Sequence, residues 1–367
     1  CAVIANVSYL VIVFSALSFF TDTPELRLFG DGNTWQSIVG ASVLLWVVHF
    51  LVLRGVQTAA GINLVATLAK LLPLGAFVAL AALAFQLDTF RLDFSGLALG
   101  VTVWEQVKNT MLITLWVFIG VEGAVVVSAR ARHKRDVGRA TLLAVLSALA
   151  VYLLITLLSL GVVPRSELSE MRNPSMAGLM VRLMGSWGEI VIAAGLIVSV
   201  CGAYLSWTIM AAEVPFLAAT HKAFPRLFAR QNSNNAPSAS LWLTNISVQV
   251  SLVLIWLTGS DYGTLLTIAS EMILVPYLLV GAFLLKSATR PLHKAVAIGA
   301  CIYGIWLLYA SGPVHLLLSV VLYAPGLLVF LYARRTHQHD RSLKRREVAL
   351  IGLLLVAAVP ATWMLVG

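Results

Sequence analysis

A chain of 367 residues in which 60% of positions are apolar and only 11% are charged exposes more apolar surface than a soluble domain can hide from water. The mean hydropathy of +0.92 fits lipid as the solvent instead. The formal net charge of +9 would suit nucleic acid, but the basic residues lie in short segments between apolar runs, as in the inner loops of membrane proteins. These features argue against a soluble enzyme and a nucleic-acid partner, and they predict an all-α, polytopic membrane protein.

A helix that crosses a bilayer needs about 20 mostly apolar residues. In chain order, the sequence predicts eleven spans: 1–20, 35–53, 61–85, 109–128, 141–163, 189–217, 238–257, 264–285, 294–310, 313–333 and 348–366. The chain begins with Cys1 inside an apolar run, without a signal-peptide pattern, so we interpret it as a fragment whose natural N-terminus lies upstream.

The loops between these spans differ in basic charge. One alternate set of loops holds eighteen Lys and Arg residues and the other holds six. Lys and Arg collect in cytoplasmic loops, so the richer set, which includes 129–140 and 334–347, is expected to face the cytoplasm. The first helix then runs outward and the C-terminus lies outside.

Cysteine and histidine give no sign of a cofactor. Cys201 and Cys301 lie inside apolar stretches, so no disulfide framework follows. The seven histidines lie mostly in or beside loops, without the HxxxH or HExxH spacing of a metal site. We therefore expect no metal, no cofactor and no enzymatic activity.

Four ionisable side chains fall inside predicted spans, where each is a functional candidate because an unpaired charge is costly there. They are Lys70, Glu122, Glu213 and Glu271. Glu213 lies near an inner loop and could equally snorkel to water. Glu271 precedes Pro276 and could instead bond to backbone groups that the proline frees. Lys70 lies near the middle of its span, so it requires a partner or a wet cavity.

The segment 115–124 is the most informative. Gly120 and Gly123 flank Glu122 in mid-span, and glycine tolerates the torsions of an unwound turn. Irregular backbone at this depth persists only where it is buried or lines a cavity, and its carbonyls suit a cationic amine. A small-residue face for helix packing is the alternative. Trp116 and Trp207 could hold such a cation on their ring faces, or could simply pack.

The motif from Trp116 to Glu122, followed by a basic loop, resembles the sixth helix of the amino acid–polyamine–organocation transporters. Residues 206–208 with 224–230 resemble the family's eighth helix and the loop after it, and 274–277 resemble its tenth. Residues 51–55 and 70–73 are most similar to the basic amino acid/polyamine antiporters, in the branch that exchanges arginine for ornithine.

This resemblance implies a single transmembrane domain, 1–367, with a five-plus-five inverted repeat that lacks its first two helices. Residues 1–85 would be the rest of the first repeat, 109–285 the second, and 294–366 additional helices that include an extra one at the C-terminus. It also implies a multi-pass protein of the bacterial inner membrane, arginine and ornithine as substrates, and a possible homodimer.

The resemblance also implies roles for individual residues. Trp116 would stack on the substrate side chain, Ile119 would line the pocket beside Gly120, and Trp207 would form part of the wall. Glu122 would be a proton-sensitive acid below the substrate. Lys70 would place an ammonium where sodium-dependent transporters bind sodium; no role transfers to Glu213 or Glu271.

The expected function is therefore exchange of arginine for ornithine by alternating access. A proton-coupled amino acid permease of the same superfamily is the main alternative. A membrane-embedded enzyme is a weaker alternative, since the sequence shows no nucleophile–base pair or metal cluster. A non-transporting scaffold is another, and the charges inside the spans count against it.

Overall fold

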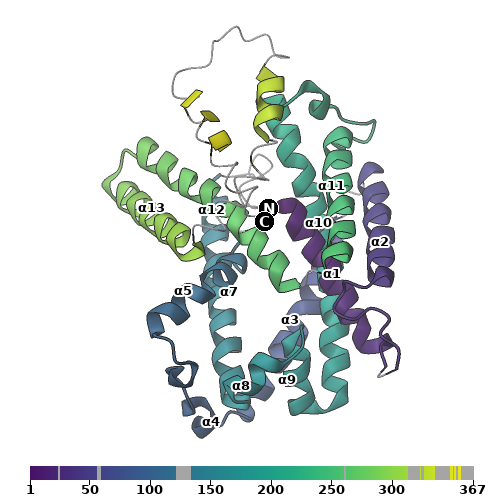
Figure 1. The fold of residues 1–367 in the computed structure, drawn as a ribbon, viewed down its shortest axis with the longest axis vertical. Helices are drawn as coiled ribbons and strands as arrows, with labels where there is room; N and C mark the ends of the chain where they lie inside the picture. The colour runs from purple at the N-terminus through teal and green to yellow at the C-terminus, as the bar shows by residue number, and fades with distance from the viewer. Residues whose placement is uncertain are drawn as a thin grey trace.

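The computed structural model describes residues 1–23, 25–55, 59–120, 134–259, 262–312, 323, 326–334, 348–349, 351–352 and 354–356. Every regular element in this part of the chain is helical (Figure 1). The elements are α1 (Ala2–Thr21), α2 (Trp35–Leu53), α3 (Ala59–Leu83), α4 (Leu87–Arg91), η1 (Leu97–Leu99), α5 (Val103–Trp116), α7 (Lys134–Val162), α8 (Arg165–Glu170), α9 (Ser175–Met184), α10 (Ser186–Thr220), η3 (Arg226–Ala229), α11 (Ser238–Thr258), α12 (Tyr262–Ser287) and α13 (Pro291–Ser311). Residues 326–334 form a further short helix.

Eight of these described helices are long and apolar enough to cross a membrane: α1, α2, α3, α7, α10, α11, α12 and α13. They confirm eight of the eleven predicted spans, with ends that differ by a few residues. The predicted spans 109–128, 313–333 and 348–366 lie partly outside the described residues. The division into two repeats stays a prediction.

Helix α1 lies at the centre of one group of helices and packs against α2, α10, α11 and α12 (Figure 1). Several of its apolar side chains, among them Val7, Leu10 and Val11, are fully buried. They form one core with Leu45 of α2 and Tyr204 of α10. A helix that is apolar all round has no face left for water, which agrees with this central place.

A line of polar side chains joins α2 to α11. Trp46 Nε1 donates to Gln249 Oε1 at 3.0 Å, and Gln249 Nε2 donates to Ser42 Oγ at 2.9 Å. One turn along, Asn245 Nδ2 lies 2.9 Å from His49 Nδ1, and both residues are fully buried. His49 is thus a histidine inside a spanning helix, whereas the histidines are expected to lie mostly in or beside loops. Hydrogen bonds between membrane helices add to the packing of apolar neighbours.

A second polar cluster closes the end of the molecule where α1 finishes. The Asp22 carboxylate accepts from the backbone N–H groups of Leu28, Phe29 and Gly30 at 3.2, 2.9 and 2.8 Å. Arg172, between α8 and α9, donates to Asp31 Oδ1 at 2.9 Å and to Ser18 Oγ at 2.9 Å. These bonds tie the α8–α9 connection to the α1–α2 connection.

A second packing unit is formed by α5, α12 and α13, which meet around Leu115, Leu274 and Leu307. Because α5 packs here while its last residue reaches toward α10, this unit sets the position of the chain segment that follows α5.

Candidate functional site

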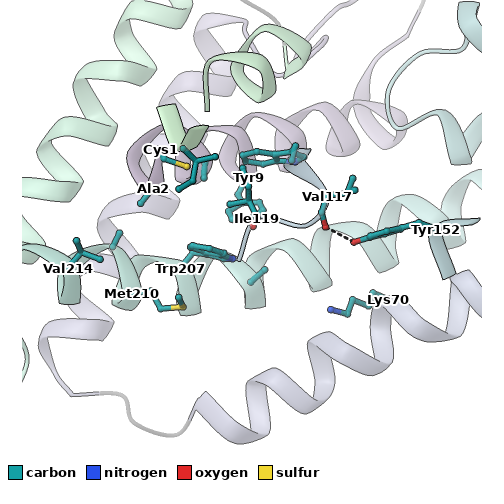
Figure 2. A pocket seen from close by; sticks show the side chains of 15 residues that line it. Cys1, Ala2, Tyr9, Lys70, Val117, Ile119, Tyr152, Trp207, Met210 and Val214 are labelled. Carbon is teal, nitrogen blue, oxygen red and sulfur yellow. Dashed lines mark hydrogen bonds between the residues drawn. The ribbon is translucent and has the colours of Figure 1, made fainter. Parts of the chain in front are cut away.

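A cavity of about 600 Å³ lies among α1, α3, α7, α10 and the end of α5 (Figure 2). Its lining includes three of the predicted site residues, Trp116, Ile119 and Trp207, together with Lys70. Tyr9 and Trp207 are almost 200 positions apart in the sequence, yet they face one space.

Helix α5 ends inside the predicted span 109–128, four residues before Gly120, near which the sequence predicts a helix break. Helix α5 begins at a capping box made by Thr102 and Glu105 and ends at Trp116. The next four residues form a turn, in which the N–H of Ile119 donates to the carbonyl of Trp116 at 3.1 Å. Gly120 has a φ of +109°, a conformation that glycine adopts without steric cost. Glu122 and Gly123 lie outside the described residues.

The turn lies directly against α10. A Cβ atom built on Gly120 would be only 2.6 Å from Cζ2 of Trp207. Trp207 is in the interior of α10, and its indole faces the cavity beside Ile119 (Figure 2). The structure therefore brings together the two segments on which the predicted site depends.

Tyr152 of α7 holds the turn from the other side. Its hydroxyl donates to the carbonyl of Val117 at 3.2 Å (Figure 2), and its ring lies edge-on to Phe118 with 5.7 Å between centroids. Carbonyls at the end of a helix lack intrahelical partners, so this bond satisfies one of them. Sequence reasoning missed both Tyr152 and Tyr9, which also lines the cavity. For Tyr152, the available signal was its place as the lone aromatic residue of the span 141–163.

Lys70 projects from α3 into the space between α3 and α10 (Figure 2). Its side chain is exposed, and no hydrogen bond or ion pair joins it to any other residue that the structure describes. It also lines a smaller cavity of about 310 Å³ between α3, α9 and α10. Lys70 thus lines two cavities, and its role stays a prediction.

The other two acidic candidates lie away from the cavity lining. Glu213 is half-buried on α10, and Glu271 is buried on α12 with 5% of its surface exposed. Neither residue gains a role in the site from its position.

The aromatic part of the lining offers ring faces to an organic cation, while the charged side chain among the described lining residues is the ammonium of Lys70. Four aromatic side chains, Tyr9, Trp116, Tyr152 and Trp207, surround the space, and none of its described lining residues is a carboxylate. Aromatic faces attract ammonium and guanidinium groups, and the turn at 117–120 adds backbone carbonyls. Within the described residues, no group of three or more His, Cys, Asp or Glu side chains is arranged to hold a metal ion.

Comparison with known proteins agrees with this geometry. Residues 1–354 match the family model described as amino acid permease. The whole chain is 86% identical over 367 residues to the "Putative arginine/ornithine antiporter" of Escherichia coli (strain K12), covering 80% of that protein. It is 43% identical over 351 residues to the "Arginine/ornithine antiporter" of Pseudomonas aeruginosa, with 90% of this chain and 72% of that protein covered.

A third relative is the "Arginine/agmatine antiporter" of Chlamydia caviae, which is 37% identical over 382 residues, with 99% of this chain and 78% of that protein covered. The family match spans nearly the whole chain, and the eight apolar helices agree with it. The chain therefore belongs to the amino acid permease family, within the amino acid–polyamine–organocation superfamily, and is a multi-pass protein of the bacterial inner membrane.

Proposed function

We propose that this protein exchanges arginine for ornithine across the membrane by alternating access. The observation that carries the proposal is the aromatic cavity at the end of α5, where Trp116 and Trp207 face one space beside the turn at 117–120. Two relatives with high identity over most of this chain are named for arginine/ornithine exchange, which supports the same pair of substrates.

The cavity favours a substrate with a cationic end. The guanidinium of arginine is planar and stacks on aromatic faces, while the shorter ornithine presents an ammonium to the same rings and carbonyls. Exchange of one cation for another moves no net charge, so it needs no ion gradient. We infer that the solutes cross chemically unchanged, as the membership of a transporter family supports.

Glu122 is proposed as a proton-sensitive acid that modulates exchange. Glu122 is two residues after Gly120 in the sequence, and Gly120 lies against Trp207 of the cavity lining. A homodimer stays a prediction.

Counterflow in proteoliposomes tests the proposal against a proton-coupled permease. Vesicles that contain the purified full-length protein are loaded with ornithine, with agmatine or with buffer, and uptake of labelled arginine is followed with and without a pH gradient. We expect rapid uptake only into ornithine-loaded vesicles, independent of the gradient. Uptake into buffer-loaded vesicles driven by the pH gradient would establish the permease instead, and a preference for agmatine would change the substrate pair.

A further inference from the structure

A groove of about 420 Å³ lies between η3, which follows α10, and the helix 326–334. One wall consists of Pro225, Arg226, Leu227 and Phe228, and the other consists of Leu328, Val329 and Tyr332. The residues 328, 329 and 332 share one face of their helix, because positions three and four apart lie above one another. Two segments about a hundred residues apart in the chain thus form one amphipathic surface, apolar except for a guanidinium and a phenol.

Basic side chains gather beside the groove in the part of the chain that the structure describes. Lys222, Arg226 and Arg230 are all exposed on the η3 side. The sequence has no Asp or Glu from 214 to 260, or from 323 to 339. The surface is therefore complementary to an anion.

We expect the groove to lie near the membrane surface. Segment η3 lies in the connection between the ends of two spanning helices, α10 and α11. Basic residues concentrate in this connection, so it is expected to face the cytoplasm. Leu227 and Leu328 are 51% and 69% exposed, so the protein leaves apolar surface beside the basic groups.

We propose that this groove binds one anionic phospholipid of the cytoplasmic leaflet. Its phosphate pairs with Arg226, and an acyl chain covers Leu227, Leu328 and Val329. Basic pockets between membrane helices on the cytoplasmic side bind anionic head groups in this way. A free phosphate would use the guanidinium and leave the exposed leucines uncovered, so the apolar walls favour a lipid.

Binding of phosphatidylglycerol to the delipidated, purified protein tests this proposal. Affinity is measured by native mass spectrometry, with phosphatidylcholine and inorganic phosphate as comparison ligands. Arg226→Gln is expected to weaken phosphatidylglycerol binding about fivefold, the equivalent of ~1 kcal/mol for one basic residue near the membrane surface. Arg226→Lys should retain most of the affinity, and Arg230→Gln, which alters an exposed arginine outside the groove lining, should have a smaller effect.

A second variant tests the groove itself without a change of charge. Val329→Trp fills the space between the walls and should reduce phosphatidylglycerol binding in a protein that elutes as a single folded species. Equal losses in Arg226→Gln and Arg230→Gln would overturn the proposal, since they would indicate only the diffuse field of the basic loop. Unchanged binding in Val329→Trp, or competition by inorganic phosphate as strong as that by the lipid, would overturn it as well.

Discussion

Gly120 lies against the indole of Trp207 so closely that a Cβ at position 120 would be 2.6 Å from Cζ2 and 3.2 Å from Cη2. The same glycine has a φ of +109°, outside the range that other residues adopt readily. Two independent constraints, one from space and one from backbone conformation, therefore require glycine here. The contact links the turn after α5 to α10, so a change at either residue is expected to disturb the cavity between them.

Gly120→Ala should reduce exchange sharply. The positive φ alone costs an alanine roughly 1–2 kcal/mol, a factor of about 5 to 30, and the contact with Trp207 adds to it. Initial rates of arginine–ornithine exchange in proteoliposomes measure the effect. Gly75→Ala on α3 is the control, because a Cβ there meets no atom within 4 Å. An exchange rate in Gly120→Ala equal to that of Gly75→Ala would contradict this account.

Replacement of the cavity tryptophans should weaken arginine binding. Trp116→Leu and Trp207→Leu each remove a cation–π partner worth up to about 2 kcal/mol when desolvated, so we expect up to roughly thirtyfold weaker binding. Affinity is measured by isothermal titration calorimetry on detergent-purified protein. Trp256→Leu serves as the control, since Trp256 is 51% exposed on α11 and does not line the cavity. If a folded double variant of Trp116 and Trp207 binds arginine normally, the two rings only pack.

The sequence allowed the spans and the helix break to be predicted for definite physical reasons. Lipid demands long apolar helices, so hydropathy located α1 and the others. Glycine beside an acidic residue in mid-span predicted an interruption near Gly120, and α5 ends at Trp116, inside the predicted span. The cost of an isolated charge in a span predicted a partner or a wet cavity for Lys70, and the residue does line a cavity.

The lining of the cavity was less accessible to sequence reasoning. A spanning helix is apolar both toward lipid and toward its neighbours, so periodicity does not reveal which face of α1 or α7 lines a cavity. Tyr9 and Tyr152 were missed for this reason. The pairing of His49 with Asn245 joins positions almost two hundred residues apart, and only the packing of α2 on α11 brings them together.

The polar line between α2 and α11 should contribute a measurable coupling energy. A double-mutant cycle of Trp46→Phe and Gln249→Leu tests the bond from the indole to the amide, which measures 3.0 Å. Hydrogen bonds between membrane helices average about 0.6 kcal/mol in such cycles, and we expect at least that value because Gln249 also bonds to Ser42. Chemical unfolding in bicelles gives the free energies. Ser251→Ala is the control, since the Ser251 hydroxyl bonds within its own helix, and a coupling near zero would contradict the prediction.

The Asp22 carboxylate should make stability depend on pH in the acid range. Burial alone would raise its pKa, but the N–H groups of Phe29, Gly30 and Leu28 and the Thr21 hydroxyl outweigh burial and lower the pKa below the ordinary 3.8. Because the folded pKa is the lower one, its stabilisation is present above that ordinary value and is lost as pH falls through the folded value. Asp22→Asn should thus lower the thermal midpoint at neutral pH, by an amount that shrinks in strong acid. Glu25→Gln, at an exposed position in the same loop, is the control. A difference that stays constant down to the lowest pH would contradict the linkage.

Lys70 provides the last prediction, because its ammonium lines two cavities and has no hydrogen bond or ion pair with the described residues. As a fixed positive charge, it is replaceable by arginine but not by methionine, so Lys70→Arg should retain much of the exchange and Lys70→Met should lose it. As a proton carrier, it would lose its coupling in both variants, because arginine keeps its proton, while Lys70→Met would continue to bind arginine. We favour the fixed charge, since one-for-one exchange of cations needs no proton.

Exchange and arginine binding are measured for both Lys70 variants at matched amounts of reconstituted protein. Lys108→Met is the control, because it removes an ammonium that lies over the ring of Tyr309, 5.1 Å from its centroid and away from both cavities. We expect this control to exchange at the parental rate. A loss of exchange in Lys70→Met is then due to the position of the Lys70 charge and not to the loss of a positive charge in general. Parental exchange by Lys70→Met would rule out both roles and leave Lys70 as a residue of the cavity wall.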